Sequence, residues 1–446
     1  MSSLLSPFAR LALLALAMPA CRPSLPQSLE AQADAKKPAA SIPQGAVPVP
    51  SAKVPPAQWT ALAQGERSFA ERLYKKLASE PGNLFFSPTS IRLALGMTYA
   101  GARNTTARQM AATLSFGDNP QLLHDAHASL LGEWQTAAQS PNPEFTLRVA
   151  NRLWGQTGRA FHPDFLQLVQ TRYGAPLQPV DFLHDVEGSR VTINRWVAER
   201  TEEKIPELLV RGILTPGTPL VLTNAVYFKA NWTHAFPAAA TSPQPFQLAP
   251  QRTVTVPMMQ LTAQLRYAKV DAAQVLELPY GMADAEGETR LAMTVFLPDD
   301  RAGLPQLEKA LAGGRLADFL SAPQPAKVQV FLPRFQTRSA FKLGQTLAAL
   351  GMPEAFDSKQ ADFSGMAALH ELYIGEVIHQ AYVAVDEKGT EAAAATAVVM
   401  APGGPPPAPP QTFRADHPFL FVIRDRRRGN ILFMGRIADP SQPAGK

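Results

Sequence analysis

Residues 386–410 read DEKGTEAAAATAVVMAPGGPPPAPP and decide how this sequence is interpreted. Taken alone, the alanines between Thr390 and Thr396 would favour the start of a helix. The segment, however, follows a strand-like run and leads into glycine and proline residues that no helix could enter. Small side chains lose little entropy and meet little steric resistance when a chain is accepted between two other strands. We therefore expect this segment to enter a sheet.

The sequence around this segment predicts helices first and strands later. Phe69, Leu73 and Leu77 recur at helical spacing, and Ser87-Pro88 marks the start of a second helix. Continuous apolar runs predict strands, because a strand buried on both faces needs no polar alternation. These runs are 220–228, 291–297, 328–335 and 373–385, with a closing hairpin of 420–423 and 431–435. The pattern predicts one α+β domain.

Composition excludes several classes of function. The chain has 446 residues and a net charge of +5, without the concentrated basic face of a nucleic-acid binder. The densest basic run, residues 424–428, is interpreted as a solvated turn, with a polyanion site as the alternative. His124 and His127 lack the glutamate of metalloprotease chemistry and are expected to be surface or packing residues. With a single cysteine, Cys21, the chain can form neither an internal disulfide nor a cysteine zinc site. We expect no metal and no cofactor.

The N-terminal residues resemble a targeting segment followed by a tether. Arg10 precedes the apolar run 11–18, and Ala20-Cys21 resembles the cleavage box of a bacterial lipoprotein, in which the cysteine is lipidated. An ordinary signal with an incidental cysteine is the alternative. The expected organisation is a signal at 1–20, a proline- and alanine-rich tether at 21–57, one domain at 58–441 and a tail at 442–446. We expect an outer-membrane or cell-surface lipoprotein, or otherwise a secreted extracellular or periplasmic protein. The only membrane contact would be a lipid anchor at Cys21.

Seven short segments occur in the order typical of one protein family. They are Asn83–Ser90 (NLFFSPTS), Leu222–Trp232 (LTNAVYFKANW), Phe331–Phe335 (FLPRF), Asp362–Met366 (DFSGM), Val385–Ala394 (VDEKGTEAAA), His417–Phe421 (HPFLF) and Phe433–Arg436 (FMGR). Each match is weak alone, but together they extend over roughly residues 60–441. The chain thus resembles the serpin family of serine protease inhibitors.

This resemblance implies a fold and an activity. The fold would be a single α+β domain with a large central mixed sheet, two further sheets, eight or nine helices and an exposed reactive-centre loop at about 387–412. The protein would not be an enzyme but a monomeric suicide inhibitor of serine endopeptidases, with cysteine endopeptidases as a further class. A target protease would cut the loop and form an acyl-enzyme. The cut loop would then insert into the central sheet and hold the distorted protease in a covalent complex.

The resemblance also assigns roles to individual residues. A shutter at the centre of the sheet would comprise Ser87, Ser90, Asn224 and His379. A breach at its top would comprise Trp232, Arg334 and Glu387, with an ion pair between the last two. The hinge of the loop would comprise Glu387, Gly389, Thr390, Ala392, Ala394 and Thr396. Strand residues alternate between the two faces of a sheet. The small side chains that would point inward are therefore Thr390, Ala392, Ala394 and Thr396, and Glu391 would point outward.

The bond that the protease cuts is left open among four residues. Counting from Glu387 in the register of the family gives Gly403 or Gly404, whereas Met400 and Ala401 offer side chains better suited to elastase-like or subtilisin-like proteases. The absence of Arg and Lys from residues 392–410 argues against trypsin-like targets. A non-inhibitory chaperone or carrier is the alternative. A secreted hydrolase has no support, because the sequence has no Gly-x-Ser-x-Gly elbow.

Overall fold

The computed structural model describes residues 53–138, 145–284, 286–368, 372–390 and 409–443. Within these ranges the α-helices are α1 (Pro56–Leu77), α2 (Pro88–Tyr99), α3 (Asn104–Leu114), α4 (Pro120–Ala138), α5 (Pro163–Tyr173), α6 (Val186–Arg200), α7 (Leu304–Ala310), α8 (Leu316–Ser321) and α9 (Gly344–Leu350). Nine helices in the described part of the chain agree with the predicted eight or nine. None of the described helices is long and apolar enough to cross a membrane.

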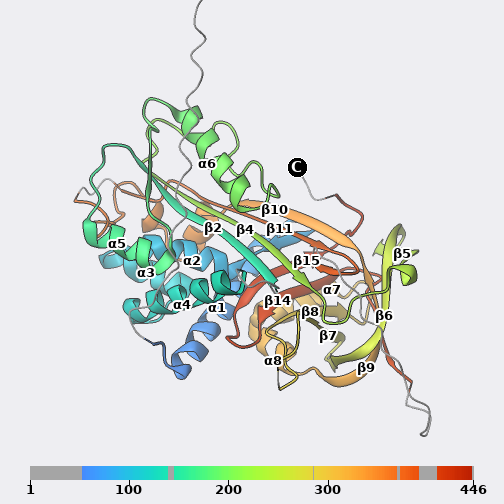
Figure 1. Ribbon diagram of the computed structural model, residues 1–446. Helices are drawn as coiled ribbons and strands as arrows, with labels where there is room; N and C mark the ends of the chain where they lie inside the picture. Colours follow the sequence, from blue (N-terminus) through green and yellow to red (C-terminus); the bar gives the residue numbers. More distant parts are fainter. Residues whose placement is uncertain (1–52, 139–144, 285, 369–371, 391–408, 444–446) are drawn as a thin grey trace, which may run out of the picture. The chain divides into compact units, whose positions relative to one another are not determined.

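A six-stranded mixed sheet carries the candidate site (Figure 1). Its strands are β2 (Phe145–Gln156), β3 (Gln178–Val180), β4 (Leu220–Asn231), β10 (Phe335–Lys342), β11 (Val377–Val385) and β12 (Gly389–Thr390). The order is β10-β11-β4-β2-β3, and β12 pairs with β4 outside this path. β11 runs parallel to β4, from Val377 opposite Leu222 to Tyr382 opposite Tyr227.

The remaining described strands form one nine-stranded sheet, where the resemblance predicted two separate sheets. They are β1 (Leu84–Phe86), β5 (Ser242–Ala249), β6 (Arg252–Val270), β7 (Ala273–Tyr280), β8 (Leu291–Pro298), β9 (Gln324–Pro333), β13 (Gln411–Arg414), β14 (Phe419–Asp425) and β15 (Ile431–Ile437). The 19-residue strand β6 causes this merger, because it pairs with β5, β7 and β9 along different parts of its length.

The predicted strand at 328–335 is wrong in its boundary, since two strands meet there. β9 ends at Pro333 and belongs to the nine-stranded sheet, whereas β10 starts at Phe335 and belongs to the six-stranded sheet. Arg334 lies between them, and its backbone N–H donates to the Pro257 carbonyl at 2.8 Å, which is the next register position of the β6–β9 ladder. The predicted closing hairpin is confirmed by the antiparallel pairing of β14 with β15.

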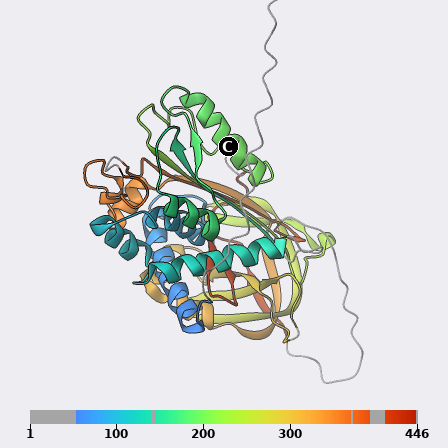
Figure 2. The same ribbon diagram turned by 60° about the vertical axis from the view of Figure 1, so that its left-hand side comes forward.

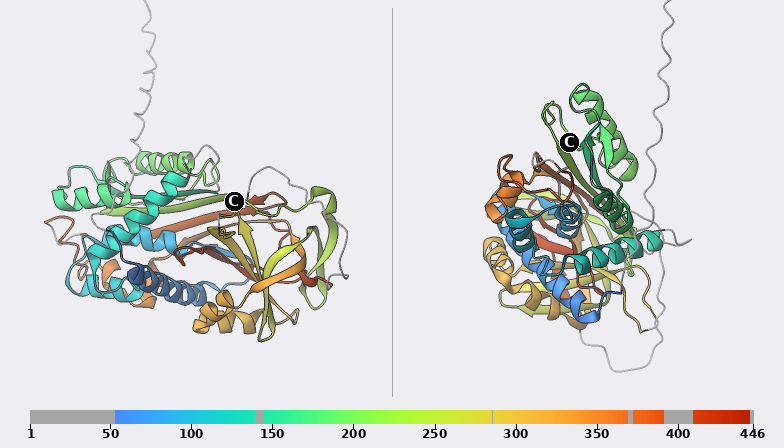
Figure 3. Two further views of the ribbon diagram at one scale, coloured as in Figure 1. Left: turned by 60° about the horizontal axis from the view of Figure 1, so that its bottom comes forward. Right: turned by 90° about the vertical axis from the view of Figure 1, so that its left-hand side faces the viewer.

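The six-stranded sheet lies between α6 on one face and α2 on the other (Figures 1, 2 and 3). The sequence determines where α2 starts: the Ser87 hydroxyl accepts from the Ser90 N–H as an N-cap, and Pro88 needs no hydrogen bond at the first helical position. α2 is buried along its whole length. It thereby brings Ser87 and Ser90 to the centre of the sheet.

Candidate functional site

The hinge segment starts to enter the six-stranded sheet at the end of the β4–β11 ladder. After Tyr382 and Tyr227 these two strands no longer pair. The chain turns through 386–388, and β12 then pairs antiparallel with β4, so that Gly389 lies opposite Asn231 and Thr390 lies opposite Ala230. The first residue of the predicted inserting segment is therefore already paired with β4.

Close packing at this point requires a glycine. Gly389 has a φ of 149°, in the region that favours glycine, and a Cβ there would lie 2.2 Å from the carbonyl oxygen of Ala230. Thr390 is fully buried, and its hydroxyl lies 3.1 Å from the Tyr280 hydroxyl. The Tyr280 ring stacks on Trp232, with 4.3 Å between the ring centroids. Thr390 thus enters an aromatic site under the top of the sheet.

The predicted breach residues lie around the turn that precedes β12. Trp232 donates from Nε1 to the Asp386 carbonyl at 3.0 Å, and its backbone N–H donates to the Lys388 carbonyl at 3.0 Å. Arg334 Nη2 lies 2.5 Å from Glu387 Oε1, and the Thr241 hydroxyl donates to the same oxygen at 2.8 Å. The structure therefore brings Trp232, Arg334 and Glu387 to one turn.

Glu387 is charged at neutral pH in this position. Burial raises the pKa of its carboxyl, but the hydrogen bonds from Arg334 and Thr241, a backbone hydrogen bond and the charge of Arg334 all lower it, so the pKa lies below its usual value. The Arg334 side chain is half exposed. An ion pair with one solvated partner contributes roughly 1 kcal/mol or less to stability, so the main effect of this pair is to orient the turn.

The four predicted shutter residues form one buried hydrogen-bonded group. Asn224 Nδ2 donates to the Ser90 hydroxyl at 2.7 Å and to the Ser90 carbonyl at 3.0 Å. His379 Nδ1 bonds Asn224 Oδ1, and the Ser87 N–H donates to His379 Nε2 at 3.0 Å. His379 and Asn224 are register partners on β11 and β4. The group therefore bridges β4 and β11, the two strands that an inserting strand would have to separate.

These contacts determine the protonation of His379. A backbone N–H can only donate, so Nε2 is the acceptor and Nδ1 carries the proton that it donates to Asn224. Burial lowers the pKa of His379 to about 3, although the hydrogen bond with Asn224 acts in the opposite direction. The imidazole is neutral at physiological pH. A second proton would set two donors against each other at Ser87.

Three residues of these groups were not predicted from the sequence. Asn151 on β2 accepts from Asn224 at 2.5 Å and extends the shutter to a third strand. Tyr280 contacts Thr390, and Thr241 binds Glu387. None of the three lies in a segment that carried the resemblance. Strand pairing brings Asn151 and Tyr280 to the site, whereas Thr241 lies in the loop just before β5.

Several predicted residues lie outside the described residues: Cys21, Ala392, Ala394, Thr396, Met400, Ala401, Gly403 and Gly404. His124 and His127 are packing residues, since both are buried and their Nδ1 atoms lie 2.7 and 3.1 Å from the Tyr173 hydroxyl. Among the described residues there is no group of three or more His, Cys, Asp or Glu side chains that could hold a metal ion.

The basic run at 424–428 is more ordered than a freely solvated turn. Arg424, Arg426 and Arg428 each form an ion pair, with Glu277, Glu288 and Glu133 as the partners. The side chains of these three arginines are only 19% to 27% exposed. Acidic partners within the same molecule neutralise most of the run, and this argues against the alternative of a polyanion site.

Comparisons with known proteins agree with this arrangement. A family model described as serpin (serine protease inhibitor) matches residues 64–440. The leukocyte elastase inhibitor of Xenopus laevis is 40% identical over 384 residues, which cover 83% of this chain and 97% of that protein. The human leukocyte elastase inhibitor is 39% identical over 390 residues, covering 85% and 99% of the two chains.

Solved structures agree as well. Uncleaved ovalbumin superimposes with a TM-score of 0.75 at 29% identity, over 85% of this chain and all of that chain. Serpin48 of Tenebrio molitor gives a TM-score of 0.74 at 30% identity, over 85% and 98% of the two chains. The family model alone covers most of the sequence. The chain therefore belongs to the serpin family.

Proposed function

We propose that this serpin is a suicide-substrate inhibitor of elastase-like or subtilisin-like serine endopeptidases. The observation that carries the proposal is the position of Thr390, which is buried and paired with Ala230 at the opening between β4 and β11. Because strand pairing has already started there, each following residue can extend the same ladder without a new nucleation step. Gly389 and the turn residues held by Trp232 fix the starting point.

The mechanism that we propose couples cleavage of the loop to this extension. The protease serine attacks a carbonyl in the loop, the C-terminal fragment leaves with a new amino terminus, and the N-terminal fragment remains bound to the serine as an ester. The freed strand then separates β11 from β4 and forms ladder hydrogen bonds on both sides. The attached protease is carried along and distorted. Its oxyanion hole and catalytic residues no longer align, so hydrolysis of the ester stalls.

The choice of target class rests on the sequence of the loop and on the relatives. Residues 392–410 hold no Arg or Lys, and Met400 and Ala401 suit a pocket for small or medium apolar side chains. The relatives that match over most of this chain are named leukocyte elastase inhibitors. Elastase-like enzymes are therefore the first targets to examine, and the scissile bond is sought among residues 400–404.

We also propose that the protein is exported and anchored by a lipid on Cys21. The support is the order of Arg10, the apolar run 11–18, Ala20 and Cys21 in the sequence. Labelling cells of a bacterial expression host with a radioactive fatty acid should label the wild-type protein and not Cys21→Ser. Equal labelling of both proteins, or of neither, would refute the anchor.

The inhibitory proposal is tested by incubating the protein with a pancreatic or leukocyte elastase and separating the products in denaturing detergent. We expect a band at the summed mass of the two proteins and loss of peptidase activity. The same elastase inactivated at its serine serves as control and should give no such band. Cleaved protein alone, at every ratio of the two proteins, would refute inhibition and favour the carrier or chaperone alternative.

A further inference from the structure

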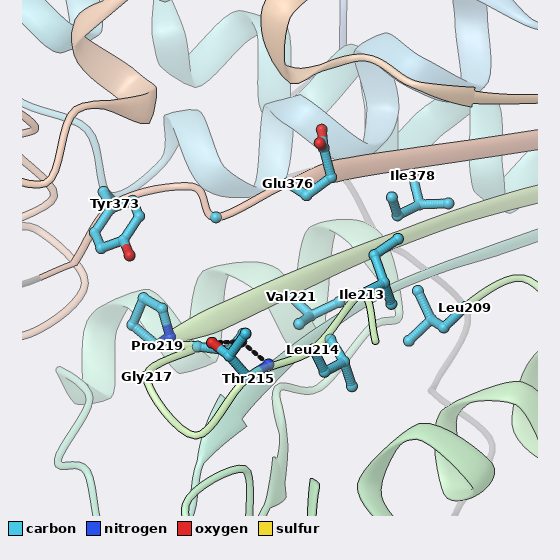
Figure 4. A pocket seen from close by; sticks show the side chains of 12 residues that line it. Leu209, Ile213, Leu214, Thr215, Gly217, Pro219, Val221, Tyr373, Glu376 and Ile378 are labelled. Atoms are coloured by element: carbon cyan, nitrogen blue, oxygen red, sulfur yellow. Dashed lines mark hydrogen bonds between the residues drawn. The ribbon is translucent and has the colours of Figure 1, made fainter. Parts of the chain in front are cut away.

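A cavity of about 170 Å³ lies among three segments of the chain (Figure 4). They are the loop between α6 and β4, the start of β4, and the residues that lead into β11. Ile213, Val221 and Ile378 are examples of lining residues from the three segments in turn. None of the described hinge, breach or shutter residues lines the cavity, so it is a separate feature of the molecule.

The cavity has a buried apolar end and a polar rim. Leu209, Val221 and Ile378 are each at most 5% exposed. Thr215 is exposed, and Tyr373 is half-buried. Figure 4 shows Tyr373 at the opposite end of the cavity from Leu209 and Ile378. A molecule that enters from solvent would therefore pass hydroxyl groups before it reaches apolar side chains.

Hydrogen bonds within the protein hold the wall formed by the loop. The Leu209 carbonyl accepts from Asn194 Nδ2 at 2.9 Å and from Arg190 Nη1 at 2.7 Å, and the Leu209 N–H donates to Asn194 Oδ1 at 2.8 Å. Further along, the Thr218 N–H donates to the Thr215 carbonyl, and the Thr215 N–H donates to the Thr218 hydroxyl, both at 3.0 Å. A wall that is already ordered lowers the entropic cost of binding a ligand.

The charges around the cavity exclude an anionic ligand. Among the described residues that line it, only Glu376 has a charged side chain. Glu376 Oε1 accepts from the Gly344 N–H at 2.8 Å and from the Val377 N–H at 2.9 Å. Figure 4 shows the carboxylate directed away from Ile213 and Val221. A ligand carboxylate or phosphate would thus be buried without a cationic partner, which is unfavourable.

Tyr373 supplies the group that can orient a ligand. The Thr215 and Thr218 hydroxyls lie 3.3 Å from each other and are engaged within their own turn. The Tyr373 hydroxyl, by contrast, has no hydrogen-bond partner in the part of the chain that the structure describes. A phenol hydroxyl can both donate and accept, so it suits a ligand with one hydroxyl group.

We propose that this cavity binds a small neutral aromatic molecule with one hydroxyl group. The ring lies between Leu209, Val221 and Ile378, and the hydroxyl bonds Tyr373. An apolar cavity of about 150 Å³ in a protein interior can bind benzene, so a single ring with a short polar substituent matches the volume here. The site shares no residue with the described hinge, breach and shutter, and the inference therefore does not depend on the proposed inhibitory function.

The direct test is an NMR titration of the intact protein, labelled at isoleucine, leucine and valine methyl groups, with benzyl alcohol. The ring should shift the methyl signals of Ile213, Val221 and Ile378 until they saturate. The signals of Ile91 and Ile431, which lie in the packed core away from the cavity, should stay in place. Ile213→Val and Ile378→Val assign two of the signals. Shifts without saturation, or equal shifts at Ile91 and Ile431, would overturn the inference.

A ligand series tests the charge and the hydroxyl separately. Benzoate at pH 7 should bind roughly tenfold more weakly than benzyl alcohol or worse, because its carboxylate finds no cationic partner. Tyr373→Phe should weaken the binding of benzyl alcohol and leave that of toluene unchanged. Binding of benzoate or benzylammonium as tight as that of benzyl alcohol would refute a neutral ligand. Unchanged affinity of Tyr373→Phe for benzyl alcohol would refute the assigned orientation.

A third test fills the buried end of the cavity. Benzyl alcohol should raise the melting temperature of the wild-type protein, because it binds the native state alone. Val221→Phe should lose this rise and the saturable methyl shifts. Val191→Phe, at a position on α6 that is 39% exposed, is the control and should keep both. Equal rises in the two variants would contradict the site. If Val221→Phe fails to fold, the methyl shifts of the wild-type protein and the Tyr373→Phe variant decide.

Discussion

Acidification should weaken the shutter through His379, and the size of this effect follows from its pKa. In the native state the pKa of His379 is about 3, because the ring is buried. In an unfolded chain the pKa of a histidine is about 6.5. The native pKa is depressed, so the stabilising contribution is fully present above pH 6.5. It is lost as the pH falls from there toward 3, because only the unfolded state takes up the proton.

The magnitude can be worked out for a fall from pH 7 to pH 5. At pH 5 protonation favours the unfolded state by about 2 kcal/mol, since each unit below the unfolded pKa contributes about 1.4 kcal/mol. At pH 7 the same contribution is only about 0.2 kcal/mol. His379 alone should therefore remove roughly 2 kcal/mol of native stability over this range. His124, with a pKa lowered by burial to about 4, should add a similar loss.

The assay is unfolding by guanidinium at pH 7 and pH 5 for wild type, His379→Gln and His184→Gln. Other groups also titrate, but their effects cancel when the pH dependence is compared between variants. We expect His379→Gln to lose about 2 kcal/mol less than wild type between the two pH values. His184, whose side chain is 75% exposed, is the control, and its variant should follow wild type. A His379→Gln variant that loses as much stability as wild type would refute the reasoning.

Three further predictions concern the hinge, the loop and the shutter. Thr390→Arg would bury an unpaired charge beneath Tyr280, at a cost of several kcal/mol, so it should turn the inhibitor into a substrate. Titration against elastase should show that many more inhibitor molecules are consumed for each protease molecule inactivated. The control variant, Thr390→Ser, should stay near wild type in the same titration. Cleavage in the loop should raise the melting temperature sharply, because the inserted strand adds hydrogen bonds and buried area; calorimetry that gives equal values for intact and cut protein would argue against insertion. Ser90→Ala removes the hydroxyl that accepts from Asn224 and should lower the free energy of unfolding by about 1–3 kcal/mol, measured in guanidinium at pH 7. No change would mean that Asn151 and the Ser90 carbonyl together satisfy the Asn224 amide.

The sequence predicted where the hinge of the loop lies, but not that the hinge is already paired with β4. Glycine at 389 and the small residue at 390 follow from what insertion requires, and the structure has both residues buried against β4. Pairing of the hinge before any cleavage was not predictable. This pairing depends on how far β4 and β11 separate beyond Tyr382. That separation is determined by packing across the whole sheet, and a local sequence pattern carries no information about it.

Non-local contacts explain the remaining differences. Arg334 interrupts the apolar run that was predicted as one strand. The residues before it belong to the nine-stranded sheet and those after it to the six-stranded sheet, so the interruption is a boundary between two sheets. Asn151 lies 73 residues from Asn224, so its part in the shutter follows from the β2–β4 register and not from any motif. The merger of two expected sheets depends on the length of β6, which apolar periodicity predicts poorly because its two ends have different neighbours.

The parallel pairing of β4 with β11 also has a consequence for synthesis of the chain. Asn151, one hydrogen-bond partner of Asn224, lies 73 residues earlier in the chain and is synthesised first. His379, the partner on the other side, lies 155 residues later and is synthesised long after Asn224. During translation β4 can pair with β2 while its other edge has no partner, and an unpaired strand edge readily accepts a foreign strand. The pairing that later admits the loop can thus form only after β11 has been translated. A cell that makes this protein has to protect that edge for the time needed to translate those residues.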